Sequence, residues 1–498
     1  MESFQYLMNG FGIALQPENL LFAAIGCFLG TLIGVLPGIG PAGGTAMLIP
    51  VTFVLPPTSA IIMLASIYYG AMYGGTITSV LVNVPGEAAS AITCLDGYQM
   101  AKKGRAGPAL FVAAVGSFIG GNVATVALVL IALPLTNLAL KFGPPEFFAL
   151  MFVGLSLVTG LASTSVTRAL VSAILGLMVA MVGIDPVMGA PRFAFGQTEL
   201  LDGFGIVPVA MGVFGVGEIL LNAEGEVHEI IETKFRDLWM TGKDWKDSFW
   251  PIVRGTFIGL FLGLIPGVGA VVPTFIAYVV EKRMSKYPEK FGTGVIEGVA
   301  SPETTNNAYA NAAFIPLFTL GIPGSPVIAI VMGALMMNGL IPGPFLFKEH
   351  GDFVWAVIAS FYTGNVILLI MNLPLIPFWV AILRIPYSIL YALILGFCVI
   401  GAYSLNNSLF DVGAMLGWGI IGYIAKKLDF PLAPLVLTLI LGPLMERGLR
   451  QSLEISRGDF TIFFTRPISA TLIAIGAAFI IATSFRMAMK VRGEDSQL

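Results

Sequence analysis

Apolar runs long enough to cross a lipid bilayer recur along almost the whole chain, and they constrain the fold more than any other feature. A transmembrane helix needs about 20 mainly apolar residues. Of the 498 residues, 56% are hydrophobic and 11% are charged, whereas soluble domains carry about 25% charged residues. The sequence therefore predicts an all-α polytopic membrane protein with roughly 10 to 12 crossings. The apolar runs lie at residues 20–36, 57–82, 108–135, 146–161, 165–183, 206–222, 251–265, 353–372, 386–406, 409–424, 430–445 and 460–485.

Several chemistries lack the residues that they need. The three cysteines, Cys27, Cys94 and Cys398, are isolated, and the only histidines are His228 and His350. A disulfide framework, a zinc site and a Ser-His-Asp triad are therefore not expected. The segment GIGPAG at 38–43 matches G-x-G-x-x-G but lacks the acid that a dinucleotide site has about 20 residues further on, and no Walker motif is present. We expect neither an enzyme nor a nucleic-acid-binding protein.

The chain contains an internal repeat. FLGTLIGVLPGIG at 28–40 aligns with FIGLFLGLIPGVG at 257–269, with six of thirteen positions identical at an offset of 229 residues. Further along, VNVPGE at 82–87 corresponds to LGIPGS at 320–325, and AGPALF at 106–111 to PGPFLF at 342–347. Order and spacing are those of an internal duplication.

Charges in equivalent loops predict how the two copies face the membrane. Cytoplasmic loops are enriched in Lys and Arg. The loop at 52–59 has no charge, but its counterpart at 281–290 has four basic residues. The bias reverses between 101–107, with three basic residues, and 337–343, with none. Equivalent loops are thus predicted on opposite sides, as in the inverted-topology repeats of many secondary transporters.

This pattern also predicts the domain organisation and the sides of the termini. No Lys or Arg precedes residue 102, which places the N-terminus outside, and the start lacks the features of a cleaved signal peptide. Basic residues near the end predict a cytoplasmic C-terminus. The predicted units are a first transmembrane repeat at 1–222, a cytoplasmic linker at 223–250, a second transmembrane repeat at 251–425 and a C-terminal transmembrane hairpin at 426–498.

Glycine and proline interrupt the apolar runs at 37–44, 85–86, 266–269 and 323–326, at matching places in the two copies. Such residues often only kink transmembrane helices or allow close packing. Paired interruptions are nevertheless a strong pointer to a transporter's binding site, because broken helices expose backbone N–H and C=O groups. The predicted substrate-binding residues are Pro37, Gly38, Gly40, Gly43, Gly44, Gly74, Gly75, Thr76, Ser79, Asn83, Pro85, Gly86, Pro266, Gly267, Gly269, Asn306, Asn307, Pro323 and Gly324.

Acidic and hydroxyl residues near the breaks predict coupling to a cation. An acid at membrane depth is expensive to bury and suggests function. The alternative for Glu297 and Glu303 is a solvated place near the interface, with Pro302 starting a helix. The predicted ion-coupling residues are Glu87, Glu297, Glu303, Thr304 and Asn311. The only metal expected is Na⁺, which we prefer to H⁺ because Thr, Ser and Asn oxygens are plentiful; no other cofactor is expected.

A rival explanation for charge compensation is an arginine that binds the substrate directly. Arg168, Arg254 and Arg384 each lie in or beside an apolar span. A guanidinium group could hold a carboxylate bidentately. The segments 68–90 and 297–326 contain no Lys or Arg, and we therefore favour cations and the ends of broken helices.

At these motifs the chain resembles the large membrane subunit of the tripartite tricarboxylate transporters. The resemblance runs in order over residues 30 to 345, and the C-terminal third matches mainly in hydropathy. One departure is Pro273, where a small or hydroxylated residue is expected. The segments are GVLPGIGP, YYGAMYGG, NVPGEAAS, LDGYQMAKKGRAGPAL, GLIPGVGA, EKRMSK, IEGVASPETTNNA and LFTLGIPGSP.

The resemblance implies a secondary transporter in a bacterial inner membrane that takes up citrate or other carboxylates with an ion gradient. It implies two partners, a small four-helix membrane subunit and a periplasmic substrate-binding protein, and it leaves open a homodimer of complexes. A channel-like protein or an exporter for small organic anions is the alternative. Substrate identity, the coupling ion and the type of transport motion do not follow from the sequence.

Overall fold

Helices make up nearly all of the structure. A computed structural model describes residues 2–36, 40–160, 165–185, 188–222, 231, 237–383 and 387–495, and their side chains except those of 2, 157–160, 166, 222, 387–390 and 482–495. The strands of this part are the two-residue β1 (Gly183–Ile184) and β2 (Pro191–Arg192), which pair antiparallel with Gly183 opposite Arg192. The prediction of an all-α chain is confirmed.

The first half of the chain, up to residue 222, contains long helices separated by shorter ones. Its helices are α1 (Glu2–Ala14), α2 (Pro17–Val35), α3 (Gly40–Thr52), α4 (Pro57–Leu81), the 3₁₀ helix η1 (Ala88–Thr93), α5 (Cys94–Lys102), α6 (Ala106–Ala139), α7 (Pro144–Gly160), α8 (Val166–Ala180), the 3₁₀ helix η2 (Thr198–Leu200), α9 (Ile206–Ala210), the π-helix η3 (Met211–Val216) and α10 (Gly217–Asn222).

The second half repeats the order of a long helix, a break and several further helices before a second break. Its helices are α11 (Gly242–Gly263), α12 (Val271–Met284), the 3₁₀ helix η5 (Pro288–Lys290), α13 (Glu297–Ala312), α14 (Phe314–Leu320), α15 (Pro326–Met337), α16 (Pro344–Glu349), α17 (Gly351–Asn372), α18 (Ile376–Ile382), α19 (Tyr387–Asn406), α20 (Leu409–Lys427), α21 (Leu432–Ile455), α22 (Ile462–Thr465) and α23 (Pro467–Asp495).

Glycines at equivalent positions let the same helix pairs pack closely in both halves. A Cβ atom on Gly30 of α2 would lie 2.3 Å from the carbonyl oxygen of Ile67 in α4. On Gly259 of α11, which lies 229 positions later, it would lie 2.5 Å from the carbonyl oxygen of Thr305 in α13. Small residues at four-residue spacing allow membrane helices to approach backbone to backbone. The duplication seen in the sequence is therefore also a duplication of helix packing.

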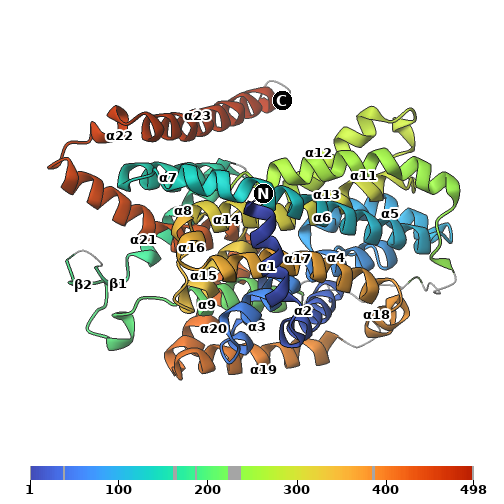
Figure 1. The fold of residues 1–498 in the computed structure, drawn as a ribbon, viewed down its shortest axis with the longest axis horizontal. Helices are drawn as coiled ribbons and strands as arrows, with labels where there is room; N and C mark the ends of the chain where they lie inside the picture. Colours follow the sequence, from blue (N-terminus) through green and yellow to red (C-terminus); the bar gives the residue numbers. More distant parts are fainter. Residues whose placement is uncertain are drawn as a thin grey trace.

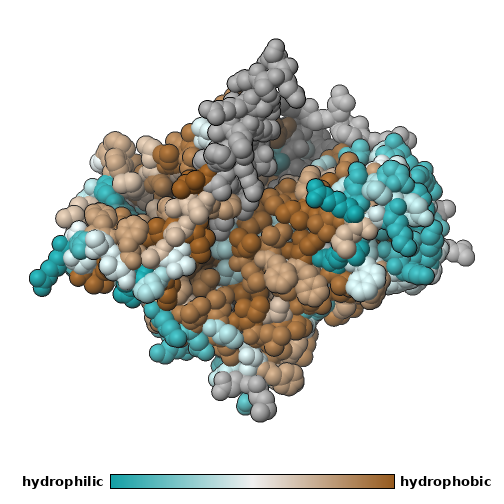
Figure 2. Space-filling model, turned by 90° about the horizontal axis from the view of Figure 1, so that it is seen from above, coloured by the Kyte–Doolittle hydropathy of each residue, from teal (hydrophilic) through white to brown (hydrophobic). Residues whose placement is uncertain are grey.

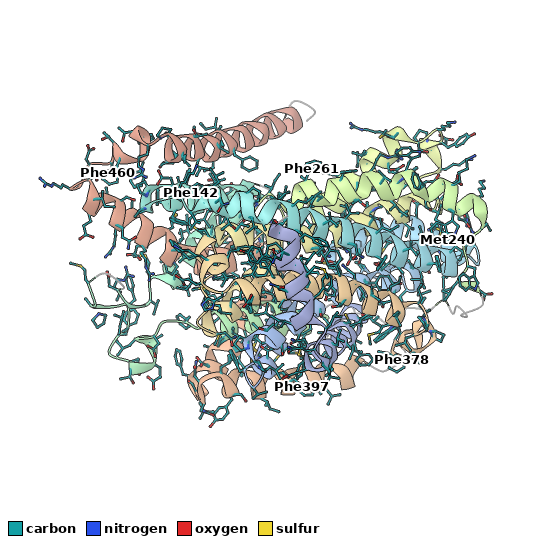
Figure 3. All side chains as sticks on the ribbon, in the orientation of Figure 1. Phe142, Met240, Phe261, Phe378, Phe397 and Phe460 are labelled. Carbon is teal, nitrogen blue, oxygen red and sulfur yellow. The ribbon has the colours of Figure 1, made fainter. Side chains whose placement is uncertain are left out.

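Helix lengths and surface character fit a chain that crosses a membrane several times. Six described helices, α2, α4, α6, α17, α20 and α21, are long and apolar enough to span, and six shorter apolar helices accompany them. Apolar residues fill the middle of the face seen in Figure 2, and hydrophilic residues gather most densely at its right end. Phe261, labelled in the upper part of Figure 3, and Phe397, labelled in its lower part, are 62% and 60% exposed. Such side chains are suited to lipid contact.

The basic loops of the two halves lie side by side at one end of the molecule. Lys103 Nζ, after α5, donates to the carbonyl oxygen of Thr293, before α13, at 2.5 Å. Both segments lie at the right end of Figure 1, and the β1–β2 hairpin lies at the left end. The charge pattern predicted these two loops on a common side, so the observed contact agrees with that prediction.

A buried carboxylate ties the two halves together near these loops. Asp96 in α5 accepts hydrogen bonds from the backbone N–H groups of Gly292 (3.0 Å), Gly294 (2.7 Å) and Val295 (2.9 Å). It also accepts one from the hydroxyl of Tyr278 at 2.8 Å. Four donors from the second half therefore surround one acid of the first, and together they satisfy a charge that would otherwise be costly to bury.

Helix α11 begins earlier than the predicted start of the second repeat at 251. Thr241 and Asp244 form a capping box, in which the Thr241 hydroxyl accepts from the Asp244 N–H at 3.2 Å. Arg105 also binds Asp244, at 2.5 Å. The polar linker therefore gives way to helix at Gly242, because capping and not hydropathy sets this end.

Candidate functional site

Residues from all four breaks line one cavity. The cavity has a volume of about 590 Å³, which is within the range of small-molecule sites. Its walls come from both predicted repeats and from the segment 426–434. The residues that line it are Gly40, Pro41, Ala42, Gly43, Tyr68, Met72, Val84, Pro85, Gly86, Glu87, Ala88, Phe214, Glu218, Gly267, Val268, Gly269, Ala270, Val271, Val272, Ser325, Pro326, Val327, Lys426, Pro431, Ala433 and Pro434.

Helices begin at this cavity in both halves. The first turns of α3, α12 and α15 and the first residue of η1 all belong to its lining. The N-terminal turn of a helix has backbone N–H groups without intrahelical partners and carries about half a positive charge. The helix ends therefore bring partial positive charge to the cavity wall, and the binding of an anion there stays a prediction.

Left-handed backbone conformations turn the chain at the breaks. Gly40 and its equivalent Gly269 have φ angles of +65° and +69°, and nothing lies within 4 Å of where a Cβ would project. In the second half, the N–H groups of Gly267 and Gly269 donate to the carbonyl oxygen of Gly324, at 3.1 and 3.4 Å. The hydroxyl of Tyr309 donates to the same oxygen at 2.8 Å. The two breaks of this half therefore support each other directly.

Glu87 connects the first half's second break to the second half. Its carboxylate caps η1 by accepting from the Ala89 N–H at 3.1 Å. The other oxygen accepts from the Asn306 amide at 2.7 Å. The side chain is buried and lines the cavity. Glu87 is therefore an acid of the cavity wall that is held from both copies of the repeat.

Glu303 lies about one turn before Asn306 on α13 but does not line the cavity. It accepts hydrogen bonds from the hydroxyls of Thr76 in α4 and Thr93 in η1. The residue is 1% exposed and Pro302 lies inside α13, so the alternative of a solvated turn is excluded for Glu303. A carboxylate with two hydroxyls is a set of oxygen ligands that fits Na⁺ or a proton.

The other predicted ion-coupling residues lie elsewhere. Glu297 is the first residue of α13 and is partly exposed. Thr304 donates to the carbonyl oxygen of Ala300, and the Asn311 amide to that of Asn307, on the face of α13 that packs against α6. The structure thus brings Glu87 and Glu303 to one region and leaves Glu297, Thr304 and Asn311 apart from them.

Several predicted substrate-binding residues support the cavity without lining it. Gly44 packs on Ile33, and Gly74 on the backbone of α2. Gly75 packs against Glu87 and Ser90, and its carbonyl oxygen accepts from the Ser79 hydroxyl at 2.9 Å.

The remaining predicted substrate-binding residues bond to another side chain, lie outside the cavity lining or fall outside the described residues. Asn307 donates to Ser117 at 2.8 Å. Asn83 is exposed with φ of +59°, and neither it, Pro266, Pro323 nor Gly324 is in the lining. Pro37 and Gly38 lie outside the described residues.

Two features of the cavity were not predicted. Lys426 in α20 and Glu218 in α10 form an ion pair in its wall. In the sequence, Lys426 is one of the basic residues near the end that predict a cytoplasmic C-terminus. Tyr68 is fully buried, and its hydroxyl has no hydrogen-bond partner among the described residues. Its place in YYGAMYGG, between two predicted sets of site residues, was the available signal.

The arginines considered as carboxylate ligands do not line the cavity. Arg168 pairs with Asp429 at 3.3 Å, and Arg254 with Glu281 at 2.5 Å. Arg384 is outside the described residues. In the part of the chain that is described, no group of three His, Cys, Asp or Glu side chains is placed to hold a metal ion.

The sequence also matches the model of a known protein family. The model of a family described as "Tripartite tricarboxylate transporter TctA family" matches residues 20–437. An "Uncharacterized 52.8 kDa protein in TAR-I ttuC' 3'region" of Agrobacterium vitis is 48% identical over 482 residues, which cover 97% of this chain and 96% of that protein.

A second relative in Agrobacterium vitis is shorter. It is an "Uncharacterized protein in TAR-II ttuC' 3'region", 48% identical over 223 residues, which cover 45% of this chain and 92% of that protein. No solved structure matches the chain.

Proposed function

Because this multi-pass membrane protein belongs to the tripartite tricarboxylate transporter TctA family, we propose that it is the large subunit of a secondary transporter that takes up tricarboxylates or related carboxylates. The observation that carries the proposal is the cavity at which helices from both halves begin. Inverted repeats with discontinuous helices let one site face either side of a membrane in turn. The proposed location is the bacterial inner membrane, with the N-terminus periplasmic and the C-terminus cytoplasmic.

The proposed transporter needs partners and a driving ion. A periplasmic binding protein would deliver the substrate, and a small four-helix membrane subunit would complete the complex. Coupling to Na⁺ or H⁺ would offset the buried acids near the substrate. Glu87 and Glu303, with Thr76 and Thr93 as further oxygen ligands, are the residues that we propose for this ion.

Uptake measurements test both parts of the proposal. Proteoliposomes that contain both membrane subunits receive the binding protein outside, and labelled citrate is offered under an inward Na⁺ gradient, an inward H⁺ gradient or neither. We expect saturable accumulation that needs the binding protein and one of the gradients, with Na⁺ preferred. Equilibration without accumulation would instead indicate a channel, and the absence of any citrate movement would remove citrate from the substrates.

A further inference from the structure

The cavity has one charged pair that lies outside the repeated glycine and proline motifs. Glu218 and Lys426 come from α10 and α20, outside the four breaks, and both line the cavity. Their side chains are 18% and 28% exposed, so both remain accessible to a molecule inside it. Lys426 is the only cationic side chain in the described lining.

Close backbone packing holds this pair beside the substrate-facing breaks. Phe214 and Glu218 are four residues apart, and both line the cavity. A Cβ on Gly43, in the first turn of α3, would lie 2.7 Å from the carbonyl oxygen of Phe214. A Cβ on Gly217 would lie 3.2 Å from the carbonyl oxygen of Gly419 in α20. The segment with Glu218 therefore joins the first break to the helix with Lys426.

The chemistry of the pair suits a second carboxylate. The helix ends attract one anionic group through backbone N–H donors. An ammonium group has three N–H donors, so it can bind another carboxylate while it keeps a bond to Glu218. Glu218 would neutralise the lysine when no substrate is present, because an unpaired buried charge is costly. The Tyr68 hydroxyl supplies a further buried polar group, which lacks a hydrogen-bond partner within the described part of the chain.

We propose that Lys426 binds a carboxylate group of the substrate, so that the cavity selects molecules with at least two carboxylates. This inference rests on the proposed function, because it names the substrate class and one contact of the same site. Glu218 is then a competitor for the lysine. The two members of the pair should therefore affect substrate affinity in opposite directions.

Three variants of the complete transporter test this inference in the citrate uptake assay. K426Q is expected to raise the KM for citrate about 10-fold or more, because a charge-assisted bond is lost. E218Q is expected to lower the KM by about twofold, because a competing anion is removed. The double variant K426Q/E218Q should keep the high KM of K426Q. Preference for citrate over acetate should fall by about 10-fold in both variants that lack the lysine.

A matched ion pair outside the cavity provides the control. R254Q and E281Q remove the charges of the Arg254–Glu281 pair, and neither residue lines the cavity. We expect the KM for citrate to stay unchanged in these variants and in their double variant. If K426Q alone is not found in the membrane, the double variant, which leaves no unpaired charge, carries the test.

Two results would overturn the inference. Equal rises in KM for K426Q and E218Q that the double variant reverses would show a purely structural pair. A wild-type KM in K426Q would show that the lysine does not contact citrate. Both results require active wild-type protein, and they therefore differ from failure of the proposed function, in which the wild type itself does not accumulate citrate.

Discussion

The second breaks of the two halves share a backbone role but differ in charge. Glu87 and its counterpart Ser325 both cap the helix that follows, by accepting from the N–H groups of Ala89 and Ile328. Only Glu87 also reaches across to the other half, where Asn306 donates to it. The comparison teaches that duplication supplied two equivalent helix starts, and that one copy alone placed an acid in the cavity wall.

The largest effect on transport is expected when Glu87 is replaced by serine, the residue at the equivalent position of the second half. Glu87→Ser keeps an oxygen that can cap η1 but removes the carboxylate that holds Asn306. We expect the initial rate of citrate uptake to fall by about 100-fold, because the acid is proposed to hold the coupling ion. Protein in the membrane, measured by immunoblot, should stay near the wild-type amount. Normal uptake by Glu87→Ser would mean that the difference between the breaks has no role in transport.

A smaller effect on transport is expected at the first breaks, where Gly40 and Gly269 have the same backbone conformation in both halves. Gly40→Val and Gly269→Val force a β-branched residue into a left-handed conformation, at a cost of about 1–2 kcal/mol or more, and place methyl groups toward the cavity. Each should reduce uptake by about 10-fold. Gly104→Val is the matched control, because Gly104 has φ of +73° and open space but is not in the cavity lining. Loss of uptake in only one of the two break variants would show that the halves use their first breaks differently.

The starts of α2 and α11 differ, and this difference predicts a modest effect of acid. The first position of α2 is Pro17, without a side-chain cap, whereas α11 has the Thr241–Asp244 capping box and Arg105. Although burial opposes it, hydrogen bonds from Thr241 and Arg105 lower the pKa of Asp244. The stabilisation is therefore present above the unfolded-state pKa and is lost as the pH falls through the folded-state pKa.

Asp244→Ala should accordingly reduce the free energy of unfolding by about 1 kcal/mol near neutral pH. Thermal unfolding of the detergent-solubilised protein, followed at several pH values, measures the effect. The difference from wild type should shrink at the most acidic pH that the protein tolerates. A difference that is constant with pH would assign the stabilisation to something other than the ionised carboxylate.

The variants that test inverted topology are expected to have the smallest effect on transport activity. Cysteines at Val54, which is 85% exposed, and at Lys286 lie in loops predicted on opposite sides. They should leave uptake unchanged and react with an impermeant maleimide from opposite faces of the membrane. Ser59 is unsuitable, because it is buried and bonded to Asn19. Cys94→Ala removes the least buried native cysteine from the background. Labelling of both sites from one face would rule out inversion.

The internal repeat predicted the parts of the candidate site that the backbone forms. Proline and glycine specify where helices stop, so the cavity-lining Gly40, Gly86 and Gly269 could be found from local sequence. Asn306 and Thr76 were found because polar residues in an apolar run need partners. By contrast, Lys426 reaches the cavity only through tertiary packing of α20 on η3 and α10, and no local pattern encodes that approach. The same holds for Asp96, whose four partners are nearly 200 residues away.

The setting of Asp96 limits how a transport cycle can proceed. Its carboxylate accepts hydrogen bonds from donors of the other half. Lys103 forms a further hydrogen bond between the adjoining loops. Pulling the halves apart at this end would strip a buried charge of most of its bonds at once. This end of the molecule should therefore act as the pivot of the cycle, and the larger displacements should occur away from it.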